Sequence, residues 1–207
     1  HPMDVFYGYV EDVYDANGNI QYNDLNGDGL LNQDDKTIIG TPNHKFIYGL
    51  NSLLSYHGFS LTLFFQGSQG NDIVNVSSIE NTVDYGYGNN LLKEVYYNHW
   101  TPETPNAKYP KATANQALNF SNRFIENGSY LRLKNIELAY SFKNLHTNWI
   151  RNAQIYVSGQ NLLTVTKYSG WDPEVNSNGG PNSIAQGLDN YTFPTSKTTT
   201  IGLRLGF

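Results

Sequence analysis

The last ten residues constrain the fold of this chain more than any other segment. From 199 to 207 the odd positions read Thr, Ile, Leu, Leu and Phe, and the even positions between them read Thr, Gly, Arg and Gly. Because successive side chains of a strand point to opposite faces, this segment predicts a strand with one apolar face, ending on the aromatic Phe207. Such strands build outer-membrane β-barrels, although an amphipathic strand of a soluble sandwich shows the same alternation.

The composition is compatible with a barrel. The 207 residues include 16 Tyr, 10 Phe and 3 Trp, only 15% of them are charged, and the mean hydropathy is -0.50. There is no apolar stretch long enough for a membrane-spanning helix, but a barrel strand needs none because half of it faces the lumen. The net charge of -5 argues against nucleic-acid binding, and the absence of cysteine excludes disulfides. The start at His1, without a leader-like segment, indicates either a removed signal peptide or a fragment of a longer protein.

The strands are expected in pairs with loops of alternating length. His57-Gly58 is a two-residue turn between two apolar-rich runs. Short connections at 57–58 and 143–152 alternate with long segments at 70–128 and 167–195, as in a barrel with short periplasmic turns and long extracellular loops. A further strand is possible near 5–10. We therefore divide the chain into 1–44, a strand and loop, and 45–207, with strands at about 45–56, 59–68, 129–142, 153–166 and 197–207.

Residues 24–35 have the spacing of a calcium-binding loop. Oxygen-bearing residues occupy the ligand positions of an EF-hand-like loop, and a glycine stands at its sixth position, where the chain must turn sharply. An Asp at the last position has a shorter arm than the usual Glu, which indicates weaker binding. The alternative is an Asp/Asn/Gly turn cluster without a metal. The expected Ca²⁺ ligands are Asp24, Asn26, Asp28, the carbonyl of Leu30, and Asp35, with Asn32 acting through a water.

Other candidate chemistry is sparse. The five histidines match no metal-ligand spacing, and there is no nucleophile elbow, phosphate loop or dinucleotide fingerprint. The carboxylates of the long loop could in principle form the catalytic pair of a glycosidase, but solvated loop charges explain them more simply, so we do not expect an enzyme. They are Glu80, Asp84, Glu94 and Glu103. Aromatic side chains in the two long loops suit stacking on sugars or packing on a partner protein, with packing inside the loops as the alternative. The contact candidates are Tyr85, Tyr87, Trp100, Tyr168 and Trp171, with Tyr96 and Tyr97 nearby in the sequence.

An ordered set of short motifs covers nearly the whole chain and resembles the SusC-like (RagA-like) TonB-dependent outer-membrane transporters of Bacteroidetes. The loop at 74–128 matches least. The motifs are Asp24-Leu25-Asn26-Gly27-Asp28-Gly29 running to Thr37-Ile38-Ile39-Gly40, Lys45-Phe46-Ile47-Tyr48-Gly49, Gly58-Phe59-Ser60-Leu61, Phe64-Phe65-Gln66-Gly67, Gly70-Asn71-Asp72-Ile73, Tyr130-Leu131-Arg132-Leu133-Lys134-Asn135-Ile136, Gly159-Gln160-Asn161-Leu162-Leu163, Lys167-Tyr168-Ser169-Gly170-Trp171-Asp172-Pro173-Glu174, Pro194-Thr195-Ser196-Lys197 and the terminal Phe207.

The resemblance implies an all-β fold: the five or six carboxy-terminal strands of a large antiparallel transmembrane barrel, which has 22 strands in such transporters. It also implies partners outside this chain: the rest of the same barrel, an amino-terminal plug that couples to TonB-ExbB-ExbD, a SusD-like surface lipoprotein and outer-membrane lipid. The implied activity is import of oligosaccharides or peptides. The alternatives are a soluble secreted β-sandwich that binds calcium and carbohydrate, and a secreted glycosidase. The cargo cannot be read from these residues.

Overall fold

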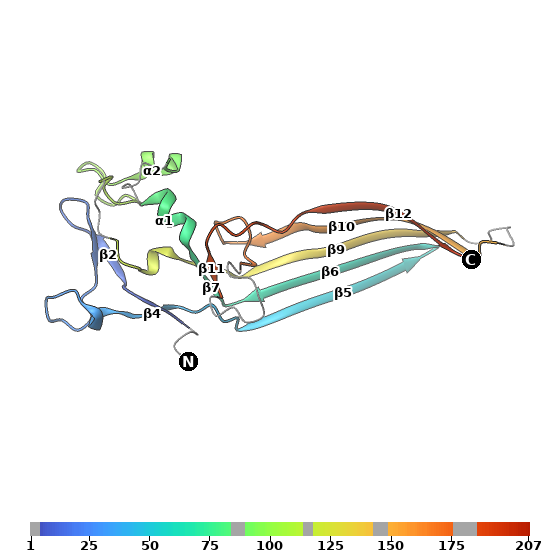
Figure 1. Cartoon of the computed structure of the whole chain (residues 1–207), viewed down its shortest axis with the longest axis horizontal. Helices are drawn as coiled ribbons and strands as arrows, with labels where there is room; N and C mark the ends of the chain where they lie inside the picture. Colours follow the sequence, from blue (N-terminus) through green and yellow to red (C-terminus); the bar gives the residue numbers. More distant parts are fainter. Residues whose placement is uncertain (1–4, 84–89, 114–117, 143–148, 176–185) are drawn as a thin grey trace. The chain divides into compact units, whose positions relative to one another are not determined.

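The computed structural model describes residues 5–83, 90–113, 118–142, 149–175 and 186–207, and divides the chain into two compact units (Figure 1). The sheet unit comprises His44–Gly70, Ser129–Lys167 and Phe193–Phe207. The loop unit comprises His1–Asn43, Asn71–Gly128 and Tyr168–Thr192. Each is described here by itself. The helices in the described part are all too short or too polar to cross a membrane.

The sheet unit is one antiparallel sheet of five long strands, in the order β12-β10-β9-β6-β5 (Figure 1). Every strand begins and ends within one residue of the range expected from the sequence. His57 and Gly58, with φ of 45° and 90°, make the tight turn between the first two strands, as a two-residue hairpin turn requires. The strands are β5 (Phe46–Tyr56), β6 (Phe59–Gln69), β9 (Tyr130–Phe142), β10 (Asn152–Thr166) and β12 (Thr198–Gly206).

The strand register gathers apolar side chains on one face of this sheet. Ile155 lies opposite Leu203 on one side and Tyr140 on the other, and Phe59 continues the row opposite Tyr140. A bulge in β9 near Asn135 shifts the register, so Leu131 remains on the same face. The side chains of this apolar face that stay exposed are Phe46, Leu50, Leu54, Tyr56, Phe59, Leu131, Leu138, Phe142, Ile155, Val157, Leu163, Val165, Ile201, Leu203 and Leu205.

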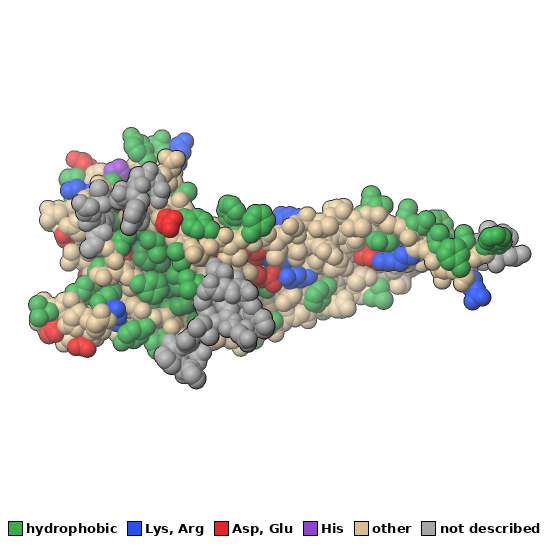
Figure 2. Space-filling view, viewed as in Figure 1, with side chains coloured by type: hydrophobic (Ala, Val, Ile, Leu, Met, Phe, Trp, Pro, Cys, Tyr) green, Lys and Arg blue, Asp and Glu red, His purple; other side chains and the backbone are tan. Residues whose placement is uncertain are grey.

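The opposite face of the sheet is mainly polar. The guanidinium of Arg204 donates two 2.8 Å hydrogen bonds to the carboxylate of Glu137 and a third to Gln154, and it lies 3.9 Å from the ring centroid of Tyr156. Figure 2 shows acidic beside basic side chains along the sheet, with hydrophobic side chains projecting at its margins. A polar face opposite an apolar one is the arrangement of a barrel wall between lumen and lipid.

Glycine at 202 on this polar face leaves room for an aromatic ring. A Cβ at that position would lie 2.3 Å from the ring of Tyr156 on the neighbouring strand. The Tyr156 ring therefore covers Gly202 while Arg204 stacks on the same ring. The alternation of glycine with polar residues in the last strand thus has a packing reason.

The loop unit is built from short elements far apart in the sequence. β1 pairs with β4 and β2 with β3, both antiparallel, and β7 lies between β8 and a parallel β11. The strand expected near 5–10 is present as β1, but it pairs with β4 and does not extend the five-stranded sheet. The elements are β1 (Phe6–Gly8), β2 (Glu11–Tyr14), β3 (Ile20–Tyr22), β4 (Thr37–Gly40), β7 (Asp72–Asn75), α1 (Val76–Thr82), α2 (Lys93–Asn98), β8 (Ile125–Asn127), β11 (Leu188–Asp189) and two 3₁₀ turns, Gln33–Asp35 and Asn122–Phe124.

A small core and a polar network hold these elements together. The carboxylate of Glu11 accepts bonds of 3.0 and 2.7 Å from Nε of Arg123 and lies 2.6 Å from its Nη2, and it also accepts a 2.6 Å bond from the Ser121 hydroxyl. Both charged side chains are largely buried, and the pairing raises the pKa of Arg123 against the effect of burial. The buried hydrophobic residues of the unit are Tyr9, Ile20, Ile73, Val74, Val83, Val95, Trp100, Tyr109, Phe124 and Tyr168.

Candidate functional site

Aromatic side chains gather at both ends of the apolar face of the sheet. At the turn end, the rings of Phe59 and Tyr140 lie 4.7 Å apart, and Phe142 lies 5.1 Å from Tyr140. At the other end, Phe46 and Tyr48 lie 5.9 Å apart. Aromatic girdles flanking an apolar band mark the two membrane interfaces of an outer-membrane barrel.

The sheet also has two edges that need partners. β5 and β12 each pair with one neighbouring strand in the described part of the chain. An open sheet edge cannot lie in lipid, where no water satisfies its backbone groups. This sheet is therefore a segment of barrel wall that closes only with strands from elsewhere.

In the predicted calcium loop, several of the expected ligands lie together. The amides of Asn26 and Asn32 donate to Oδ2 of Asp28 at 3.0 and 3.4 Å, and Asn32 also donates to the carbonyl of Leu30 at 3.2 Å. The carboxylate of Asp24 accepts 2.7 Å bonds from the N–H groups of residues 27 and 29, both glycines with positive φ. The loop is therefore folded around its own side chains in the way that Asx turns allow.

The last expected ligand, Asp35, has a different environment. Its carboxylate is buried and accepts 2.9 and 2.8 Å bonds from the N–H groups of Leu25 and Asn32. These backbone donors, that of Asn32 foremost, lower the pKa of Asp35. The N–H of Asn26 donates a third, longer bond of 3.4 Å to the same carboxylate. Two carboxylate oxygens offer about four lone-pair sites, so these three bonds leave at most one site for a cation. No three His, Cys, Asp or Glu side chains of the described residues are arranged to hold a metal ion, so a cation here would also need the amide and carbonyl oxygens.

The five aromatic contact candidates divide into three groups. Tyr85 and Tyr87 lie outside the described residues. Trp100 and Tyr168 are buried, which corrects the prediction that they offer exposed rings to a ligand or partner. Trp100 packs over Gly18, and the hydroxyl of Tyr168 donates a 2.5 Å hydrogen bond to Asp189.

Trp171 is the one candidate that the structure exposes among those it describes. It is 79% exposed, on a turn anchored by the buried Tyr168 and Asp172. The carboxylate of Asp172 accepts a 2.9 Å bond from the N–H of Glu174 and so closes this turn. Trp171 therefore stays a predicted contact residue. Burial and the hydrogen bond to Asp189 raise the pKa of Tyr168, so its hydroxyl stays protonated.

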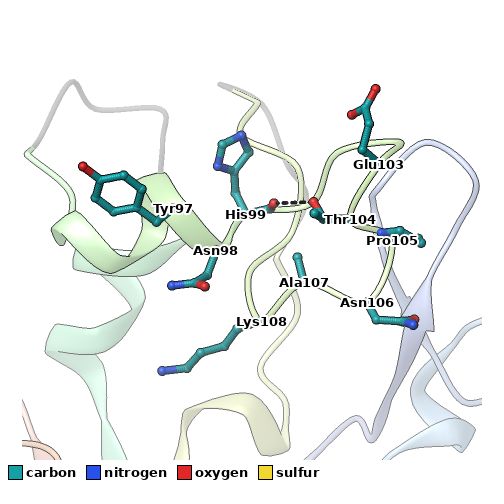
Figure 3. Close-up of a pocket in the computed structure, with 9 residues that line it drawn as sticks. All are labelled: Tyr97, Asn98, His99, Glu103, Thr104, Pro105, Asn106, Ala107 and Lys108. Atoms are coloured by element: carbon teal, nitrogen blue, oxygen red, sulfur yellow. Dashed lines mark hydrogen bonds between the residues drawn. The ribbon is translucent and has the colours of Figure 1, made fainter.

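An open pocket of about 440 Å³, which was not predicted from the sequence, lies beside the end of α2 (Figure 3). The preceding Tyr96-Tyr97 pair was the available signal, but the sequence does not indicate which loop faces it. In Figure 3 one side of the pocket comes from the end of α2 and the other from the loop that follows. The lining residues are Tyr97, Asn98, His99, Glu103, Thr104, Pro105, Asn106, Ala107 and Lys108.

Together, the two-faced sheet, its aromatic ends and its unpaired edges define a segment of an outer-membrane β-barrel. No protein-family model matches the chain. Two TonB-dependent receptors of Formosa agariphila are similar to it. One is 36% identical over 189 residues, which cover 89% of this chain and 18% of the receptor. The other is 32% identical over 196 residues, which cover 92% of this chain and 20% of the receptor. SusC of Bacteroides thetaiotaomicron, also a TonB-dependent receptor, is 31% identical over 208 residues, covering 98% of this chain and 19% of SusC.

Solved structures give the same result. The RagAB peptide transporter superposes with a TM-score of 0.82 at 26% identity, over 98% of this chain and 22% of the matched chain. The RagAB peptide importer in its closed-closed state superposes with a TM-score of 0.81 at 27% identity, over 98% of this chain and 23% of the matched chain. The chain belongs to the SusC-like TonB-dependent receptors of the outer membrane. It spans about a fifth of the length of the curated relatives it matches.

Proposed function

We propose that this chain is the carboxy-terminal barrel part of a transporter that imports oligosaccharides or peptides across the outer membrane. The observation that carries the proposal is the continuous apolar face of a sheet whose other face is polar. One face suits lipid and the other a water-filled lumen. The relatives favour this function over a secreted β-sandwich, since they are TonB-dependent receptors and a peptide importer.

The partners of the whole transporter lie outside this chain. We propose that strands from the rest of the protein pair with β5 and β12, and that a plug domain couples the barrel to TonB-ExbB-ExbD. A SusD-like surface lipoprotein would cover the extracellular mouth of the barrel. These partners follow from the resemblance, and the open edges of the sheet support the first of them.

The strand order supports one orientation in the membrane. The tight turn at 57–58, the connection between β9 and β10, and the end of β12 all lie at the same end of the sheet. Short turns face the periplasm in such barrels. We therefore place 70–128 and 167–195, which supply most of the loop unit, outside the cell.

An epitope tag tests this orientation in the full-length protein. A tag inserted between 167 and 195 should bind antibody on intact cells, whereas the same tag in 143–152 should bind only after lysis. Labelling of both tags only after lysis, with the barrel correctly assembled, would show that the topology is wrong.

We also propose that residues 24–35 hold a structural Ca²⁺ through Asp24, Asn26, Asp28, the Leu30 carbonyl and Asp35. The donor set is all oxygen, as calcium prefers, and Asp28 already contacts Asn26 and Asn32. Nearby carboxylates repel one another unless a cation neutralises them. A bound Ca²⁺ would stabilise the loop and would not take part in transport.

Calorimetric titration of the full-length protein with Ca²⁺ tests this site. We expect a dissociation constant on the order of 10⁻⁴–10⁻³ M, as for other extracellular modules. Changing Asp24 and Asp28 to Asn should abolish the binding heat, whereas Asp34→Asn, which removes one carboxylate charge at a non-ligand in the same loop, should preserve it. Equal Ca²⁺ binding by the Asp24/Asp28 variant and by Asp34→Asn would show that the motif is an Asp/Asn/Gly turn cluster and not a calcium site.

A further inference from the structure

The pocket beside α2 is held in shape before any ligand arrives. The N–H of Trp100 donates to the carbonyl of Tyr109 at 2.8 Å, and the N–H of Tyr109 donates to the carbonyl of Asn98 at 3.0 Å. Across the loop, the hydroxyls of Thr101 and Thr104 lie 2.9 Å apart. Trp100 and Tyr109 are buried beneath it. A loop fixed in this way loses little conformational entropy on binding.

Three polar groups that line the pocket have open hydrogen-bonding capacity. The carboxylate of Glu103 and the amide of Asn106 have no hydrogen-bond partner in the part of the chain that the structure describes. His99 Nδ1 lies 2.8 Å from the carbonyl of Tyr96, which can only accept, so Nδ1 carries the proton and Nε2 is free to accept. The pocket therefore offers two acceptors and one amide that can donate and accept.

The charge of the lining disfavours anions. The one ammonium among the lining residues, that of Lys108, lies 3.3 Å from the carboxylate of Glu94 and is 5.0 Å from the ring centroid of Tyr109. Lys108 is thus paired with a carboxylate, whereas Glu103 has no partner in the described chain. A ligand that donates hydrogen bonds and carries no negative charge fits this set.

Exposed aromatic rings adjoin these polar groups. Tyr97 lines the pocket and is 67% exposed, and Tyr96 beside it is 73% exposed. Their ring centroids lie 5.1 Å apart, and Lys93 Nζ lies 5.8 Å from the Tyr97 ring centroid. Exposed aromatic faces gathered at one place on a soluble surface indicate a contact site.

We propose that this pocket is a binding subsite for a neutral oligosaccharide. The flat ring of Tyr97 suits the C–H face of a sugar, and vicinal hydroxyls can donate to Glu103 and to His99 Nε2 while they accept from Asn106. The volume of about 440 Å³ falls within the range of small-ligand sites. The inference deepens the proposed transport function, on which it rests, by naming a substrate class.

A peptide fits the same pocket less well. Peptide binding usually uses an exposed strand edge for main-chain hydrogen bonds, or a cation that captures the terminal carboxylate. The lining described here contains neither: its residues come from a short helix and a turn-rich loop, and Lys108 is paired.

Saturation-transfer NMR on the full-length protein in detergent tests the proposal. The probes are neutral heptasaccharides of four types: an α-glucan, a β-glucan, a mannan and a fructan. At least one should show saturation transfer. Tyr97→Ala should weaken its binding by about tenfold, equivalent to about 1.4 kcal/mol, and Glu103→Gln should weaken it measurably while preserving the shape of the pocket. Tyr7→Ala, at an exposed tyrosine that does not line the pocket, is the matched control.

Three outcomes would overturn the subsite. The first is that no heptasaccharide binds, and the second is that binding survives both pocket variants unchanged. The third is that a mixed tetrapeptide library binds in place of the sugars and loses binding in the same variants. Each result leaves the transporter proposal standing if the epitope tags report the expected topology, because that test does not involve the pocket.

Discussion

The two units are held together by different means. In the sheet unit, long strands share backbone ladders of nine to twelve paired residues, and a register shift in β9 interrupts two of these ladders. The hydrophobic side chains that this unit buries in the described chain are Tyr130, Ala139 and Ala153. In the loop unit, strands of two to four residues depend on a side-chain core and on buried polar pairs. The sheet unit therefore relies on regular backbone pairing and on its surroundings, and the loop unit on specific contacts.

This difference predicts unequal sensitivity to mutation. A strand of the sheet loses little when one exposed side chain changes, provided that the new side chain suits the lipid or the lumen. The loop unit has few ways to compensate for a lost contact, because each of its short strands is fixed by one or two partners. Four substitutions test this contrast.

The largest effect is expected from Arg123→Met in the loop unit. It leaves the carboxylate of Glu11 buried without its ion pair, which costs about 3–5 kcal/mol. Hydrogen–deuterium exchange on the full-length protein should show lost protection in β2 and β8, with β9 and β10 unchanged.

The double variant Glu11→Gln/Arg123→Met is the control for that experiment. It removes both charges and should recover part of the loss, since no uncompensated carboxylate remains. Simultaneous loss of protection in β9 and β10 would contradict the separation into two units.

The same contrast explains which parts of the fold could be predicted from sequence. The strands of the sheet unit follow from period-two alternation and turn signals such as His57-Gly58, which are local properties. The loop unit depends on pairings such as Val74 with Leu188 and with Ile125, and on no local repeat. Its short helices, α1 and α2, lie in a segment expected to be only loop.

The candidate site was predictable to the same limited degree. The spacing of Asp24, Asn26 and Asp28 places them in one loop, because such motifs are local. Composition alone could not show that Trp100 is buried over Gly18 or that Tyr168 donates to Asp189, since both partners are distant in sequence. The pocket at Tyr97 was missed because its loop folds back onto α2.

The second effect concerns the apolar face of the sheet. Leu203→Arg places a charge where lipid is expected and should cost about 2–4 kcal/mol near the bilayer midplane. Thr200→Arg, at an exposed position on the polar face of the same strand, should be tolerated. The fraction of heat-modifiable barrel in the outer membrane measures both. Equal tolerance at the two positions would contradict the assignment of the faces.

The third effect concerns packing on the polar face. Gly202→Ala forces the ring of Tyr156 to move, because the new Cβ would lie 2.3 Å from it, and overpacking of this kind costs about 1–3 kcal/mol. The temperature at which the barrel loses heat-modifiability should fall. The double variant Tyr156→Ala/Gly202→Ala removes the clash, so an equal fall in that variant would show that the ring is not the cause.

The smallest effect is expected at the edge of the pocket. The hydroxyl of Tyr109, and then the ammonium of Lys108, lower the pKa of Glu94 from its usual 4.5. A carboxyl whose pKa is lowered by folding stabilises the fold above its unfolded pKa, and this stabilisation is lost as the pH falls from about 4.5 through the lowered value. Because both charged side chains are about half exposed or more, Glu94→Gln should cost about 0.5 kcal/mol or less at neutral pH.

Exchange protection of the 99–109 loop, measured from pH 6 to pH 3, should decline in the parent and change less in Glu94→Gln. The control is Glu103→Gln, which removes a carboxylate without a partner in the described chain. Exchange protection in this variant should decline with falling pH as in the parent, and protection that does not change with pH would contradict the assignment to Glu94.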